Sequence, residues 1–140
     1  MKKLWILIMA LVMSVSAQEI AIVKLLQGNV KASSAGKSVN LKLGSMLDEN
    51  MVVETSAKSS TTIVFNDNSV LVLSENSIIN LKKYVFKPSE KSYDFQLFLK
   101  HGSATFESGK IGEVAPESFI FETPQGTVSI RGTKFLVNVE

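Results

Sequence analysis

The chain contains no cysteine, one histidine and one arginine. Without cysteine it has no disulfide, no thiol nucleophile and no thiolate ligand for zinc, so burial of side chains must supply its stability. A zinc site or a serine triad would have to use His101, and no G-x-S-x-G motif accompanies it. We therefore interpret His101, which precedes Gly102, as a turn or surface residue. The sequence predicts no catalytic, metal or cofactor site.

The chain also lacks an excess of basic charge once its first residues are set aside. The fifteen basic residues include Lys2 and Lys3, and the remaining thirteen equal the thirteen acidic residues in number. A protein that binds nucleic acid electrostatically needs a clustered basic surface. A role in nucleic-acid binding is therefore not expected.

The N-terminus has the pattern of a secretory signal peptide, which we expect to form a helix before the all-β domain. Lys2 and Lys3 precede an apolar run from Leu4 to Met13, and Val15-Ser16-Ala17 are small residues suited to signal peptidase. The run is shorter than the roughly 20 residues of a membrane span. We expect cleavage near Ala17/Gln18, a periplasmic or secreted protein without a membrane anchor, and one mature domain over residues 18–140.

The rest of the chain predicts an all-β fold. Apolar residues alternate with polar ones in short runs rich in valine, isoleucine, phenylalanine and threonine, separated by turn residues. About a dozen short strands favour one compact domain, either a sandwich or a coiled, solenoid-like sheet. The expected strands are EIAIVKLL, NVKAS, SVNLKL, MVVET, STTIVF, SVLVL, SIINLKKYVF, SYDFQLFLK, SATFES, SFIFET, TVSI and KFLVNV.

One weak internal repeat supports the coiled alternative. Asp67-Asn68-Ser69 before VLVL matches Glu75-Asn76-Ser77 before IINL, although a plain hairpin explains the two copies equally well. Asp67 is interpreted as a turn-forming residue, because the glycine and the bidentate glutamate of a calcium loop are missing. The segment KPSEKS, residues 87–92, is expected to be an exposed loop. Core packing is expected to explain most of the phenylalanines in the last third: Phe95, Phe98, Phe106, Phe119, Phe121 and Phe135.

The inward-facing parity changes near the single arginine. Val128 and Ile130 occupy even positions, whereas Phe135, Val137 and Val139 occupy odd ones. Side chains alternate between the two faces of a strand, so we expect a β-bulge or tight bend at residues 131–133.

Such a bend would redirect the side chain of Arg131. Its five-donor guanidinium could tie backbone carbonyls or an acid such as Glu122 together, as a structural clamp. The alternative is that Arg131 recognises an anionic ligand or partner.

The residues around Arg131 resemble the FecR family, whose periplasmic domain carries the pattern T-P-x-G-x-x-x-x-R-G-T-x-F-x-V. The matching positions are Thr123, Pro124, Gly126, Arg131, Gly132, Thr133, Phe135 and Val137. Upstream, the segment LQGNV at residues 26–30 and the Leu43-Gly44 turn are also similar to the family. The likeness covers most of residues 18–140.

The resemblance implies a sensor role in the envelope. FecR-like regulators relay a signal from an outer-membrane receptor to a cytoplasmic sigma factor. They carry a sigma-binding segment and a membrane helix before this domain, whereas here the first strand follows the signal peptide at once. The expectation is a free-standing exported copy without sigma-factor contact.

We therefore expect a non-catalytic module that recognises an envelope protein, such as an outer-membrane receptor or regulator, or a glycan. The main alternative is a structural protein that assembles through strand edges. A small glycan hydrolase is a third alternative, because the spacing of two carboxylates cannot be judged from sequence.

Overall fold

The structure is a computed structural model that describes residues 19–129 and 134–140. These residues form twelve strands and three short helical segments. The strands are β1 (Glu19–Gln27), β2 (Val30–Ser34), β3 (Lys37–Asn40), β4 (Met46–Asp48), β5 (Val52–Thr55), β6 (Ser60–Phe65), β7 (Val70–Leu73), β8 (Ile78–Lys87), β9 (Ser92–Glu107), β10 (Phe119–Thr123), β11 (Gly126–Val128) and β12 (Lys134–Val139). The helical segments are η1 (Pro88–Glu90), α1 (Lys110–Val114) and η2 (Pro116–Ser118). The prediction of an all-β fold is confirmed.

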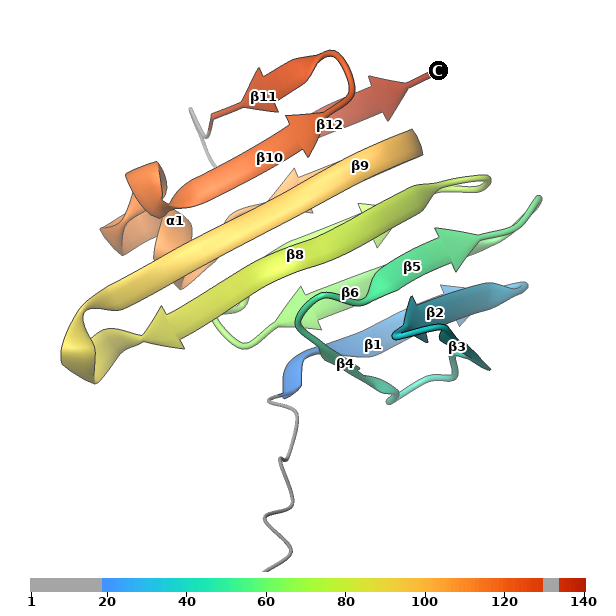
Figure 1. The fold of residues 1–140 in the computed structure, drawn as a ribbon, viewed down its shortest axis with the longest axis horizontal. Coiled ribbons are helices and arrows are strands. Elements are labelled where there is room, and N and C mark those ends of the chain that lie inside the picture. The colour runs from blue at the N-terminus through green and yellow to red at the C-terminus, as the bar shows by residue number, and fades with distance from the viewer. Residues whose placement is uncertain (1–18, 130–133) are drawn as a thin grey trace, which may run out of the picture.

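The strands belong to one curled sheet whose two halves pack face to face (Figure 1). The half called sheet A here has the order β4-β1-β6-β7-β9-β12. The other half, sheet B, has the order β3-β2-β5-β8-β9-β10-β11. Strand β9 belongs to both: residues 92–101 pair with β8 in sheet B, and residues 102–107 pair with β7 and β12 in sheet A.

The chain changes sheet six times at a turn with a left-handed residue. Two of these residues are Gly44, between β3 and β4, and Asn50, between β4 and β5, with φ values of 84° and 68°. The other four, Gly28, Lys58, Asn76 and Gly102, have φ values of 74°, 54°, 51° and 95°. They lie between β1 and β2, between β5 and β6, between β7 and β8, and within β9. Left-handed backbone at these points redirects each strand into the opposite half. The fold therefore combines the two predicted alternatives: it is a coiled sheet whose two halves form the layers of a sandwich.

Phenylalanines fill the space between the halves. Phe65 of sheet A lies 4.7 Å, centroid to centroid, from Phe95, and Phe106 stacks on Phe119 at 4.5 Å. Such pairs add to the free energy gained by burying their area. The prediction that most of the six phenylalanines of the last third pack in the core is confirmed. Four of them are buried, namely Phe95, Phe106, Phe119 and Phe121, whereas Phe98 and Phe135 are half-buried.

Three local features differ from the predicted pattern. The segments SYDFQLFLK and SATFES form the single strand β9, because Gly102 bends the strand without ending it. Strand β4 was not predicted, and neither was α1, whose five residues are too few to show a helical period. The segment KPSEKS forms an exposed turn around η1, as expected.

The predicted signal-peptide helix lies outside the described residues. Within residues 19–129 and 134–140, no helix has the length and apolar character needed to cross a membrane.

Candidate functional site

The family-like residues at the C-terminus begin in a tight hairpin between β10 and β11. The Thr123 hydroxyl donates to the Gly126 carbonyl at 3.1 Å, and the Gln125 backbone N–H donates to the same hydroxyl at 3.2 Å. Gly126 has a φ of 154°, in a region that is essentially restricted to glycine. Thr123, Pro124 and Gly126 therefore form this turn, which the Thr123 hydroxyl stabilises.

The later residues of the pattern attach β12 to the core. Phe135 and Val137 are half-buried and pack against it, while Leu136 points outward and is 69% exposed. The Phe135 ring lies 5.6 Å from both Phe106 and Phe121. The predicted odd parity of the inward residues is confirmed for β12.

The predicted bulge or bend at Arg131, Gly132 and Thr133 lies outside the described residues. Its two flanks are informative, because β11 pairs with β10 in sheet B, whereas β12 pairs with β9 in sheet A. The change of parity thus falls between strands of different sheets. Glu122, the predicted acid partner of Arg131, lies 3.4 Å from the Lys82 ammonium.

Two strand edges lie close to this C-terminal pattern. Within the described residues, β12 pairs only with β9 and β11 only with β10, so each has one side without a partner strand. Strand β12 offers six residues along that edge and β11 offers three. Unpaired N–H and C=O groups of such an edge can accept a further strand. The predicted edge near the C-terminus is present.

Asp67 organises the turn between β6 and β7. It is 2% exposed, and its carboxylate accepts hydrogen bonds from the Ser69 N–H at 3.1 Å and the Ser69 hydroxyl at 2.8 Å. The bond to the Ser69 N–H makes an Asx turn, as predicted. The carboxylate also accepts from the Ile111 backbone N–H at 3.0 Å, 44 residues away. Asp67 therefore fixes the start of α1, a long-range role that the sequence did not indicate.

Tyr84 completes this buried cluster. Its hydroxyl donates to the Asp67 carboxylate at 3.1 Å and accepts from the Asp67 backbone N–H at 2.8 Å. Burial raises the pKa of Tyr84 well above its ordinary value, and the charge of Asp67 raises it further. Tyr84 stays protonated and acts as a structural donor.

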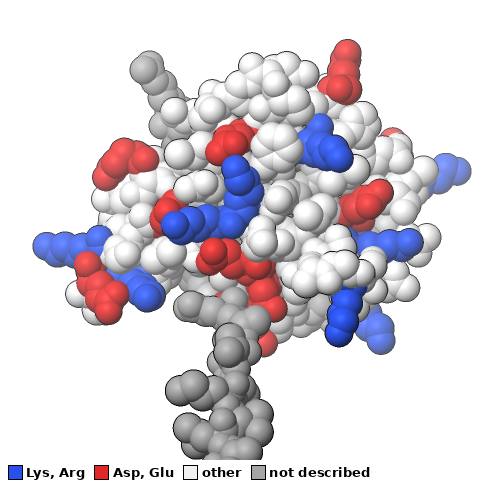
Figure 2. All heavy atoms as spheres, viewed as in Figure 1, with Lys and Arg blue, Asp and Glu red and all other residues white. Residues whose placement is uncertain are grey.

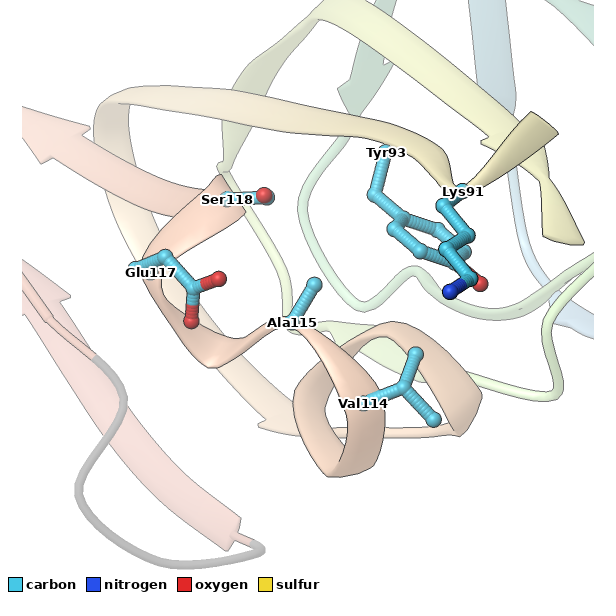
Figure 3. A pocket seen from close by; sticks show the side chains of 6 residues that line it. All are labelled: Lys91, Tyr93, Val114, Ala115, Glu117 and Ser118. Atoms are coloured by element: carbon cyan, nitrogen blue, oxygen red, sulfur yellow. The ribbon is translucent and has the colours of Figure 1, made fainter.

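A cleft of about 420 Å³ lies between the start of β9 and the α1–η2 segment (Figure 3). Tyr93 and Val114 contribute apolar surface, and Lys91 and Glu117 contribute opposite charges. Because Asp67 anchors α1, it also fixes one wall of this cleft. The cleft is in the size range of ligand sites and was not predicted.

His101 is exposed, as predicted, and lies where β9 is about to enter sheet A. The strand pairing shifts register between Ile78 and Ile79, next to this residue. No group of three or more His, Cys, Asp or Glu residues in the described part of the chain is arranged to hold a metal ion.

The comparison with known families agrees with this arrangement. The sequence model of one family, described as FecR protein, matches residues 51–140, well over half of the chain. The chain belongs to the FecR family, a regulatory and non-catalytic domain family. No curated protein and no solved structure matches it.

The match extends from just before β5 to the end of β12. It includes the sheet crossings at Lys58, Asn76 and Gly102 and the whole C-terminal pattern. The family assignment supports a regulatory role in the envelope, where FecR domains of regulators are periplasmic.

Proposed function

We propose that the protein is an exported, non-catalytic signalling module that recognises another protein of the envelope. Its FecR-type domain supports the regulatory role. Export is supported by Lys2, Lys3 and the apolar run up to Met13, with cleavage expected near Ala17/Gln18. The mature domain would then comprise residues 18–140, and the first strand begins at Glu19.

The observation that carries the binding role is the edge of β12 that has no partner strand in the part of the chain that the structure describes. Val137 and Val139 point inward and hold the strand on the core, so its backbone is ordered before any partner arrives. An ordered edge lowers the entropy cost of adding a strand. We assign this edge to an extended segment of an outer-membrane receptor or another envelope regulator.

A glycan is the second ligand class that we consider. The cleft of Figure 3 combines the Tyr93 ring with the Ser118 hydroxyl and the charged groups of Lys91 and Glu117. An aromatic face with a few polar groups is a common ligand environment. The β12 edge remains the favoured site because it adjoins the C-terminal pattern of the family.

Arg131 is proposed to be the internal clamp of this region. The chain passes from sheet B to sheet A between Ser129 and Lys134, and a five-donor side chain is suited to such a junction. Arg131→Leu should lower the free energy of unfolding by several kcal/mol, about the scale for breaking a buried polar network. Urea unfolding measures this, with Arg131→Lys as the variant that keeps the charge. An unchanged stability would instead favour recognition of an anionic ligand.

A set of substitutions tests the role of the β12 edge. Leu136 on β12 and Val39 on β3 are exposed apolar residues on edge strands of different sheets, 69% and 55% exposed. A lysine on an edge strand disfavours strand addition. Leu136→Lys should reproduce the changes in transcript levels caused by deleting the gene. Val39→Lys, and Thr62→Lys on the same outer face of sheet A but not on an edge strand, should leave transcripts as in the wild type.

The same experiment can reject the proposal. If deletion changes no transcript, the protein does not signal. If Val39→Lys acts as strongly as Leu136→Lys, the partner does not select the β12 edge. Periplasmic levels of all three variants must equal the wild-type level, which immunoblotting measures.

The second candidate function is structural assembly through strand edges. It is favoured by β3, an edge strand of sheet B whose four residues are all exposed. Two open edges in one sheet would allow copies to join end to end. Light scattering over a concentration series tests this alternative: growth into regular multimers supports assembly, and a limiting small species supports the signalling module.

A further inference from the structure

The two outer faces of the molecule differ in charge. On sheet B, Lys82 and Glu122 form an ion pair at 3.4 Å, and Lys83 and Asp94 form another at 3.3 Å. Figure 2 shows basic and acidic side chains distributed over the face on which β8 and β5 lie in front. This is an ordinary solvated surface.

The outer face of sheet A has an uncharged centre. Its central hairpin, β6–β7, points Thr62, Val64, Val70 and Val72 outward, and all four are half-buried. Neighbouring strands continue this surface across the whole half-sheet. The residues that do so are Ile22, Leu25, Met46, Thr105 and Leu136.

The exposed apolar side chains of this surface are contiguous and do not occur singly. Leu25 and Leu136 are 64% and 69% exposed, and Met46 is 44% exposed. The cross-strand pairs Ile22–Val64 and Val64–Val70 link the apolar residues into a continuous row. Contiguous apolar surfaces of this kind on soluble proteins mark contact sites.

We propose that a second copy of the chain covers this face, related by a two-fold axis that runs between β6 and β7. The strand order is β4-β1-β6-β7-β9-β12. A half-turn about an axis parallel to the strands lays β6 on the partner copy's β7, β1 on its β9, and β4 on its β12. Valine and threonine then meet valine and threonine at the centre, so the interface is self-complementary.

The charges around the uncharged centre fit the same symmetry. Lys134 of β12 lies toward the end of sheet A at which Asp48 ends β4. Glu107 of β9 is in the row of Val70 and Val64, which continues to Ile22 of β1, two residues before Lys24. The two-fold brings Lys134 near Asp48 and Glu107 near Lys24, each pair occurring twice. Opposite charges at a rim favour this orientation over others.

The area of this face determines how strongly the two copies are expected to associate. Six strands at about 4.8 Å spacing and about five residues of 3.4 Å give about 500 Å² per copy, or about 1,000 Å² in total. That is the low end of specific interfaces, so the dimer should be reversible. The backbone edge of β12 is not used, and each copy could still add a partner strand.

Sedimentation equilibrium of protein purified from cells that express the full chain tests the dimer. The wild type should show a reversible monomer–dimer equilibrium. Thr62→Lys and Val72→Glu should each weaken dimerisation roughly tenfold or more, because a charge is desolvated beside the axis. Position 62 of one copy faces position 72 of the other, so mixing the two variants should restore a dimer.

Val52→Lys is the matched control, because Val52 is a half-buried, outward valine on sheet B. It should dimerise like the wild type, and equal thermal midpoints of all variants should show that each is folded. A wild type that is monomeric at every concentration overturns the proposal. Undiminished dimers of Thr62→Lys, or a mixture that stays monomeric, overturn it as well.

Discussion

Two turns with the same sequence pattern perform different tasks. Asp67-Asn68-Ser69 and Glu75-Asn76-Ser77 both place the asparagine in a left-handed conformation, with φ values of 69° and 51°. Both also bury the serine, at 1% and 0% exposure. The two copies therefore share a turn geometry, but the first closes the β6–β7 hairpin within sheet A and the second carries the chain from sheet A to sheet B.

The acids of the two turns point in different directions. Asp67 is buried and binds the backbone of α1, whereas Glu75 is exposed and accepts from the Lys58 N–H at 2.8 Å. The shorter side chain stays inside its turn, and the longer one reaches the neighbouring corner of the coil. One turn thus anchors a segment distant in sequence, and the other joins successive turns of the coil.

The largest expected effect comes from breaking the first turn. Asp67→Ala leaves the N–H groups of Ser69 and Ile111 without their acceptor and should lower the free energy of unfolding by about 3 kcal/mol or more. Urea unfolding measures this, with Asp67→Asn as the variant that keeps an acceptor oxygen. A loss below 1 kcal/mol, on the order of one exposed hydrogen bond, would contradict the anchoring role.

The next largest effect is expected where Gly102 packs against Ser77 of the second turn. A Cβ on Gly102 would collide with Ser77, whereas one on Gly36 would meet nothing within 4 Å, although both glycines have positive φ. Gly36→Ala should cost about 1 kcal/mol for its backbone alone, and Gly102→Ala about 3 kcal/mol because the overlap is added. Thermal unfolding of the two variants measures the difference. Equal losses would mean that the corner is not closely packed.

High pH should reduce the contribution of the first turn, through Tyr84, to the free energy of unfolding, and should leave the contribution of the second turn unchanged. The unfolded chain releases the tyrosine proton near its ordinary pKa of about 10, whereas folded Tyr84 keeps its proton to a higher pH. Above that ordinary pKa the unfolded state binds fewer protons, so this contribution to stability falls as pH rises. Tyr84→Phe should show a weaker alkaline loss when unfolding is followed from neutral to alkaline pH. Parallel curves would show that Tyr84 does not ionise on unfolding.

The smallest effect is expected at Glu75. Glu75→Gln keeps an oxygen that can accept from the Lys58 N–H, so the stability should change by less than about 0.5 kcal/mol. Urea unfolding at low and high salt checks this. A loss comparable to that of Asp67→Ala would remove the distinction between the two turns.

The alternating residues were enough to locate most of the strands. In β6 the burial alternates at every residue, and in β12 Phe135 and Val137 face inward as their parity predicts. Most of the turns with left-handed residues were also visible as Gly or Asn between apolar runs, whereas Lys58 gave no such signal. These signals are local, because each depends on the preference of one residue or on a period of two.

The remaining features depend on contacts between distant residues. Asp67 meets Ile111 across 44 positions, and neither neighbourhood signals the other. Strand β10 pairs in parallel with β9, and the sequence gives no sign of that register. The cleft beside Tyr93 arises only after α1 has been anchored. The uncharged outer face of sheet A likewise needs the strand order, because its residues come from six separate strands.

Photo-crosslinking in living cells tests the role of the β12 edge most directly. A photoreactive phenylalanine is placed at position 136 on β12 or at position 39 on β3, both of which are exposed edge positions. We expect a discrete adduct with a different envelope protein from position 136, beside any adduct with a second copy of the chain, and no adduct with a different protein from position 39. The absence of any such adduct from position 136, or the same adduct from both positions, would contradict this expectation.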